Sequence, residues 1–194
     1  SSGIETGMST AKRLFVMRHA KSSWDNPGLD DHERPLAPRG HRAVEVMGTY
    51  LQTTGIAPQL VLCSTSRRTR ETLEGIAVGG EHLIEPALYS ATCEEVLTRL
   101  RQLPDTISSV MLIGHNPTVQ ILVLRLSNND GAGVSDARRD AMKRKFPTGA
   151  LATLSFDCAW SDLAAGRARL EEFVTPKGFS GKPEVGAVAP GRPA

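Results

Sequence analysis

The feature that most constrains the fold is a short apolar run at residues 14–17, which ends abruptly on the pair Arg18-His19. A short apolar run bounded by polar residues is typical of a buried β-strand. In open α/β sheets, ligands bind outside the carboxyl ends of the strands, so this pair would lie where chemistry takes place. The guanidinium group matches phosphate oxygens, and the imidazole supplies a base or nucleophile near neutral pH.

The rest of the chain alternates strand-like runs with helix-like segments. Strands are predicted at residues 13–17, 59–63, 108–113, 151–156 and 169–174, and helices at 39–53, 94–103 and 118–126. The first two helices carry apolar residues on one face, and the third is apolar almost all round. The alternation predicts an α/β fold, a three-layer α/β/α sandwich with a mostly parallel central sheet.

Two further strand ends carry side chains suited to a phosphoryl group. After the second strand, Ser64 or Thr65 is expected to cap a helix whose first turn holds Arg68, and helix N-termini attract anions. After the third strand, Gly114 permits close backbone approach and His115 faces the same crevice. Each residue alone could be an ordinary surface group. Three such ends in one chain indicate a shared phosphate site.

The composition of the 194 residues excludes several classes of protein. A net charge of +2 gives no electrostatic argument for nucleic-acid binding, and no apolar run approaches the roughly 20 residues that span a membrane. No signal peptide is evident, so a cytoplasmic protein is predicted. The three cysteines are odd in number and widely spaced, which fits neither disulfides nor a zinc site. We expect no metal and no cofactor.

Three regions are predicted along the chain. Residues 1–10 are interpreted as a vector-derived remnant and lead segment, 11–175 as the folded domain, and 176–194, rich in Pro and Gly, as a flexible tail. Residues 138–145 include five Lys and Arg side chains. This basic segment is either a solvated surface helix or a docking surface for an acidic or phosphorylated partner.

The motifs together resemble the histidine phosphatase superfamily, which has the phosphoglycerate-mutase-like fold. The matching segments are Arg18-His19-Ala20, the series Ser64, Arg68 and Thr72, the pair Gly114-His115, and Pro35-Leu36 with Gly40. Within the superfamily the chain is most similar to the SixA-type phosphohistidine phosphatases. That similarity lies in residues 18–24, 34–36, 114–117 and 147–150.

The resemblance implies a covalent mechanism. His19 would be the nucleophile that accepts the phosphoryl group, and Arg18, Arg68 and His115 would bind its oxygens. Such roles agree with a loose phosphoryl transition state, which needs positioning and positive charge. The implied function is a phosphatase acting through phosphohistidine, with a histidine-phosphorylated protein as the expected substrate.

The remaining candidate residues concern substrate contacts and the general acid. Ser22 and Asp25 stand where the family often places phosphate-contacting hydroxyl and asparagine side chains. Mutase-like members carry a glutamate where this chain has Ser90. Because imidazole is a better leaving group than an alkoxide, the missing acid favours a phosphoramidate substrate. Glu85 or Asp25 could instead supply the proton.

Several rival functions are weighed against this one. A broad phosphomonoesterase on small esters and a catalytically silent phosphate-binding module both remain alternatives. A mutase is disfavoured by the missing glutamate. A cysteine phosphatase would need an arginine six residues after its cysteine, but Thr69 stands six residues after Cys63. No Gly-rich Lys-Ser/Thr loop for nucleotides is present. The expected partner is thus a phosphate-bearing substrate, without nucleic acid or membrane.

Overall fold

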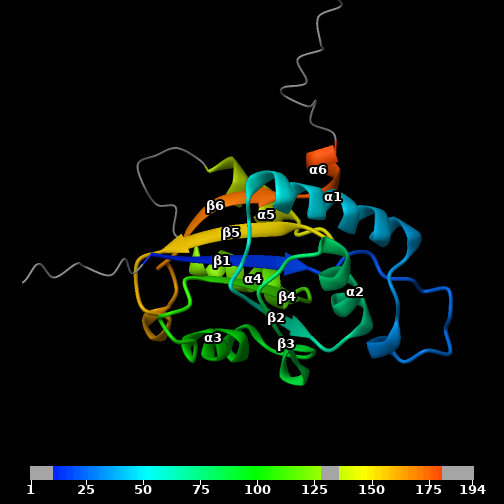
Figure 1. The fold of residues 1–194 in the computed structure, drawn as a ribbon, viewed down its shortest axis with the longest axis horizontal. Coiled ribbons are helices and arrows are strands. Elements are labelled where there is room, and N and C mark those ends of the chain that lie inside the picture. The colour runs from blue at the N-terminus through cyan, green and yellow to red at the C-terminus, as the bar shows by residue number, and fades with distance from the viewer. Residues whose placement is uncertain (1–10, 128–135, 181–194) are drawn as a thin grey trace, which may run out of the picture.

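A six-stranded sheet forms the centre of the computed structural model, which describes residues 11–127 and 136–180 (Figure 1). The strands are β1 (Lys12–Arg18), β2 (Leu60–Ser64), β3 (Glu81–Glu85), β4 (Ser109–Gly114), β5 (Leu151–Phe156) and β6 (Arg169–Val174). Their order across the sheet is β3-β2-β4-β1-β5-β6. The first four are parallel to one another, and β5 runs antiparallel to both β1 and β6.

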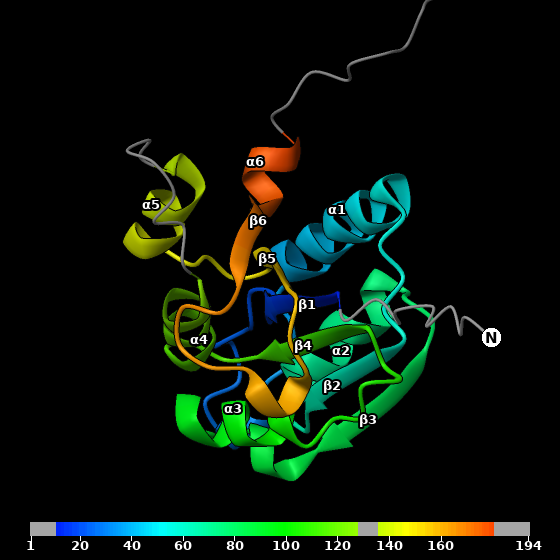
Figure 2. The same cartoon turned by 90° about the vertical axis from the view of Figure 1, so that its left-hand side faces the viewer.

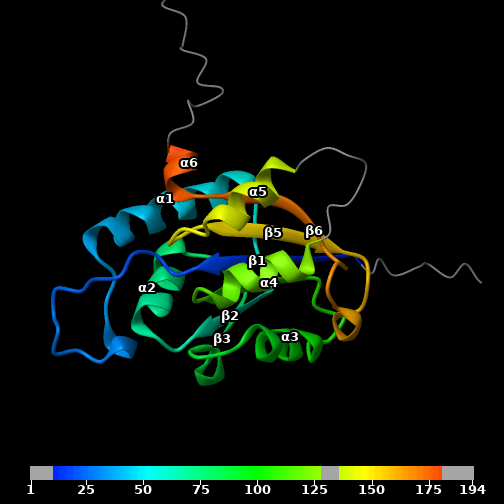
Figure 3. The same ribbon diagram turned by 180° about the vertical axis from the view of Figure 1, so that it is seen from behind.

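Helices cover both faces of this sheet, as Figures 1 and 3 show from opposite sides. One face packs against α1 (Pro38–Thr54), α2 (Arg67–Ile76) and α6 (Pro176–Ser180). The other packs against α3 (Cys93–Arg101), α4 (Thr118–Leu126) and α5 (Ala137–Arg144). Short 3₁₀ helices, η1 (Asp31–Glu33), η2 (Pro86–Leu88) and η3 (Trp160–Asp162), complete the chain. The predicted three-layer α/β/α sandwich is confirmed.

The apolar run at residues 14–17 is apolar at every position for a simple physical reason. Leu14 and Val16 face the core beneath α3 and α4, whereas Phe15 and Met17 face the core beneath α1 and α2. All four side chains are at most 1% exposed. A central strand covered on both faces must be apolar at every position, rather than at alternate ones.

Some predicted elements differ from those observed. The edge strand β3 was not predicted, because its pattern Glu-His-Leu-Ile-Glu is polar and mostly exposed. The prediction that Ser64 or Thr65 caps α2 is wrong: Ser66 is the cap, and its hydroxyl accepts from the N–H of Thr69. The helical structure also continues past residue 175, because α6 packs on α1 with Phe179 edge-on to Tyr50. Residues 1–10 and 181–194 lie outside the described residues.

Within the described residues, no helix is long and apolar enough to cross a membrane.

The loop that follows β1 is held tightly against α1 and α2. The N–H of Ala20 donates to the Thr72 hydroxyl at 3.0 Å, and the N–H of Ala37 donates to the Lys21 carbonyl at 2.8 Å. Gly40, in the first turn of α1, lies directly against this loop. A Cβ atom there would lie 2.1 Å from the Lys21 carbonyl oxygen, so only glycine fits.

We therefore expect Gly40→Ala to lower the free energy of unfolding by about 1–3 kcal/mol, because backbone must move to admit the methyl group. Urea denaturation measures the change. Gly79→Ala is the matched control, since a Cβ at Gly79 meets nothing within 4 Å. The control should change stability by less than about 0.5 kcal/mol. Equal effects of the two variants would contradict the close approach at Gly40.

Candidate active site

Three strand ends bring the predicted motifs together. β1 ends at Arg18 and is followed by His19, β4 ends at Gly114 and is followed by His115, and the loop after β2 leads into α2, which carries Arg68. The N–H of His19 donates to the Gly114 carbonyl at 3.1 Å. The two imidazole rings face each other with centroids 5.3 Å apart. One site at the carboxyl edge of the sheet thus contains all four residues.

His19 is buried and has a defined tautomer. Its Nδ1 lies 2.7 Å from the Ala20 carbonyl oxygen, an acceptor, so Nδ1 carries the proton and Nε2 carries the lone pair. Only 8% of the residue is exposed. Burial, together with the nearby cationic groups Arg68 and Arg18, lowers the pKa of His19 to about 3. The ring is therefore neutral at physiological pH, with one nitrogen available as a nucleophile.

His115 is fixed in the other tautomer. The Nη2 of Arg68 lies 3.5 Å from its Nδ1, and an arginine can only donate. The Nε2–H therefore donates to the Ser64 hydroxyl, 2.8 Å away. Burial, and then the charge of Arg68, lowers the pKa of His115 to about 4.

The two arginines are anchored through part of their donor groups. Arg18 donates from Nη1 to the Phe146 carbonyl at 3.0 Å, and its Nε is buried without a partner within the described part of the chain. Arg68 donates from Nη1 to the Asp31 carbonyl at 2.7 Å and from Nη2 to the Asp31 carboxylate at 2.9 Å. Both guanidinium groups are thus oriented before any anion binds.

Asp31 is the functional residue that sequence reasoning missed. Its carboxylate accepts from Arg68, from Arg34 Nη1 at 2.9 Å and from the Tyr89 hydroxyl at 2.5 Å. These donors, the tyrosine first, hold the pKa of Asp31 well below its usual range. The only available signal was its position three residues before Arg34, where a segment that resembles the family begins. No local pattern shows that Arg68 lies beside it.

Ser22 and Asp25, the two predicted substrate contacts, lie in different surroundings. Ser22 is buried, and its hydroxyl accepts from Arg34 Nη2 at 2.6 Å, so it belongs to the network around Asp31. Asp25 lies on the exposed part of the same loop. Among the described residues, no hydrogen bond or ion pair joins either side chain to the two histidines.

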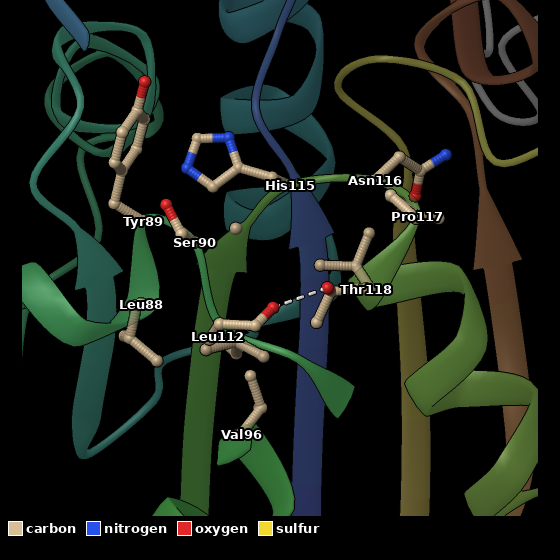
Figure 4. A pocket seen from close by; sticks show the side chains of 12 residues that line it. Leu88, Tyr89, Ser90, Val96, Leu112, His115, Asn116, Pro117 and Thr118 are labelled. Carbon is tan, nitrogen blue, oxygen red and sulfur yellow. Dashed lines mark hydrogen bonds between the residues drawn. The ribbon is translucent and has the colours of Figure 1, made fainter. Parts of the chain in front are cut away.

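A cavity of about 200 Å³ opens beside His115 (Figure 4). Its inner part is apolar, formed by side chains that include Leu88, Val96 and Leu112, whereas Tyr89 and Ser90 lie near the imidazole ring. The Thr118 hydroxyl donates to the Ala91 carbonyl at 2.7 Å. Asn116 does not cap α4: Pro117 occupies the N-cap position without a side-chain hydrogen bond, and the Asn116 amide nitrogen donates to the Phe146 carbonyl at 3.2 Å.

Two alternative chemistries find no support in the geometry. The thiol of Cys63 donates to the Ser64 carbonyl, and burial raises its pKa to about 12, so it is no thiolate nucleophile. Within residues 11–127 and 136–180, no three His, Cys, Asp or Glu side chains are grouped as metal ligands would be.

Comparison with known proteins identifies the family of the chain. A model of the histidine phosphatase superfamily, branch 1, matches residues 14–96. A candidate SixA phosphohistidine phosphatase from Nakamurella multipartitia has a solved structure that is 34% identical, with a TM-score of 0.76, covering 86% of this chain and 96% of that one. The chain belongs to the histidine phosphatase superfamily.

Other relatives extend the match. An uncharacterised protein of Mycobacterium tuberculosis is 35% identical over 161 residues, covering 83% of this chain and all of the relative. A candidate SixA structure from Agrobacterium tumefaciens is 29% identical, with a TM-score of 0.69, covering 85% of this chain and 98% of that one. The predicted superfamily, its fold and the phosphatase class of enzyme are thereby confirmed.

Both site histidines of this histidine phosphatase are expected to stay neutral from pH 7 down to about pH 5, because burial among cations disfavours imidazolium. The same shifts make folding less favourable below about pH 6.5, since the unfolded chain then binds more protons. Histidine ¹⁵N NMR across this range measures the first effect, with urea-unfolded protein as the control. A midpoint near pH 6.5 for either folded ring would contradict the expectation.

Proposed function

We propose that this enzyme hydrolyses phosphohistidine in proteins through a covalent phosphoryl intermediate on His19. The observation that carries the proposal is the hydrogen bond from Nδ1 of His19 to the Ala20 carbonyl, which leaves Nε2 unprotonated in a buried, cationic site. In the first step, the Nε2 lone pair bonds to phosphorus while the phosphorus–nitrogen bond of the substrate breaks. Water then attacks the phosphohistidine and releases inorganic phosphate.

The remaining site residues would hold the transferred group. Arg18 and Arg68 present charged donors whose orientation is set by Phe146 and Asp31. The buried Nε of Arg18, which has no hydrogen-bond partner among the described residues, is suited to donate to a phosphate oxygen. Pre-oriented positive charge is what a loose phosphoryl transition state requires.

The carboxyl groups around the site support a nitrogen leaving group. Glu85 is held by both ends of its carboxylate in an ion pair with Arg99 on α3. Asp31 stays ionised because three donors stabilise its charge, so it has no proton to give. Ser90 lines the cavity where mutase-like members have glutamate. Phosphohistidine needs a general acid least, because its second ring nitrogen can already bear a proton.

A second candidate function rests on the cavity beside His115. Its volume of about 200 Å³ and partly polar rim could receive the alcohol of a small phosphate ester. This broad phosphomonoesterase would use the same nucleophile and the same arginines. The two functions differ in how the rate depends on the leaving group.

The His19→Ala variant is expected to lose more than about 10³-fold in kcat while remaining folded, because the nucleophile is removed. Arg68→Ala should cost about 10²–10³-fold through lost charge stabilisation. Arg67→Ala is the matched control, since this neighbour on α2 pairs with Glu71 and should act nearly as wild type. Turnover with labelled phosphoramidate, quenched in alkaline detergent because phosphohistidine is acid-labile, should trap phosphoryl label on wild type only. Label on His19→Ala would identify another nucleophile.

The proposed substrate predicts a steep dependence on the leaving group. A positioned acid contributes roughly 10²–10⁴-fold, so alkyl phosphates such as phosphoserine peptides should be cleaved slower than phosphohistidine peptides by at least about 10²-fold. Asp31→Asn should slow both substrates alike by disturbing Arg68, and Glu85→Gln should slow neither. A selective loss of alkyl phosphate cleavage in either variant would identify that residue as the acid. A flat profile would favour the phosphomonoesterase.

A further inference from the structure

A second hollow, much larger than the cavity beside His115, lies between α1, α6 and the segment that leads into β5. Its volume is about 650 Å³. Five cationic side chains line it, and no Asp or Glu does; we call it the basic groove. Its cations are Lys21, Arg39, Arg42, Lys145 and Lys177. This concentrated charge contrasts with the net charge of only +2 for the whole chain.

The charges of the basic groove are uncompensated in the part of the chain that the structure describes. Within the described residues, none of the five takes part in an ion pair, whereas Arg67, Arg99 and Arg138 elsewhere pair with glutamates. Four of the five are exposed, and Lys21 is half-buried. Unpaired cations around one hollow create a positive potential that attracts an anionic partner.

The basic groove adjoins the active site through shared backbone. Lys21 follows His19 by two residues, and the N–H of Gly149 donates to the carbonyls of Arg18 and His19. Phe146, which anchors Arg18, comes directly after Lys145 of the groove. Figure 2 shows α6 beside α1, near the edge of the sheet that carries β5 and β6. A chain with one side chain at His19 could therefore continue into the groove.

The basic segment noted in the sequence is divided by the structure. Arg139 bonds to Ser127 and the Leu124 carbonyl, and Arg138 pairs with Glu172, so both stabilise the fold around α5. Lys145, at the end of the segment, lines the groove instead. Of the five groove cations, only Lys145 belongs to that segment, whereas Arg39 and Arg42 lie on α1 and Lys177 on α6.

We propose that the basic groove binds an acidic polypeptide segment next to the phosphohistidine of the substrate, a proposal that rests on the function proposed above. The groove has about three times the volume of the cavity beside His115, which suits several residues of a chain. Pro147 and Pro176 add apolar surface between the cations. A lining that is both cationic and apolar fits a polypeptide with acidic and apolar side chains.

The test compares two phosphohistidine peptides, one flanked by Glu residues and one by Ser residues, with p-nitrophenyl phosphate as a small probe of the catalytic residues. At low salt, the double variant R42E/K177E should lose roughly tenfold in kcat/KM for the acidic peptide. It should cleave the neutral peptide and p-nitrophenyl phosphate as wild type does. Arg167→Glu, at the opposite end of the sheet, is the matched control and should change none of the three rates.

A binding measurement separates this proposal from the proposed function. Fluorescence anisotropy of the labelled acidic peptide without phosphate should show binding to wild type and weaker binding to R42E/K177E, whether or not phosphohistidine is cleaved. Equal affinity for both enzymes would overturn the groove proposal alone. Displacement by inorganic tripolyphosphate at lower concentration than by unlabelled acidic peptide would also overturn it, in favour of a small polyanion.

Discussion

The register between β1 and β4 determines the active site. The strands run parallel and pair Arg18 with Gly114, so the next residue of each is a histidine at the same edge of the sheet. The backbone bond from His19 to Gly114 holds the two ends together at 3.1 Å. A shift of one residue would move every side chain of β1 to the opposite face and bury Arg18 in an apolar core. The apolar contacts of both cores oppose such a shift.

The charge state of His19 and His115 depends on the groups that surround them at these strand ends. Burial, and then the nearby guanidinium groups of Arg18 and Arg68, disfavour imidazolium, so both rings stay neutral. Asp31 supplies the compensating negative charge and orients Arg68 through two hydrogen bonds. Asp31 is itself held by Arg34 and Tyr89. The candidate site is thus built in layers, from the strand ends outward to the loop that contains η1.

Much of the fold could be predicted from the sequence because its signals are local. β5 and α4 have the predicted bounds because apolar runs of these lengths fit few alternatives, and β6 has the predicted bounds as well. The edge strand β3 was missed because Leu83 and Ile84 are its only apolar residues. The parallel majority of the sheet was correctly expected, but the antiparallel direction of β5 depends on chain connections that no local pattern records.

For the candidate site, the sequence by itself determined which residues are proposed to carry chemistry. Arg18, His19, Arg68 and His115 each follow or open a recognisable element, and their residue types indicate phosphoryl transfer. Only the tertiary structure decided the rest: the tautomers of both histidines, the link from Asp31 to Arg68, and the position of Ser22 beside Arg34. The physical reason is distance along the chain. Strand and helix signals act over a few neighbouring residues, whereas Asp31 and Arg68 are 37 positions apart and meet only when the sheet aligns their elements.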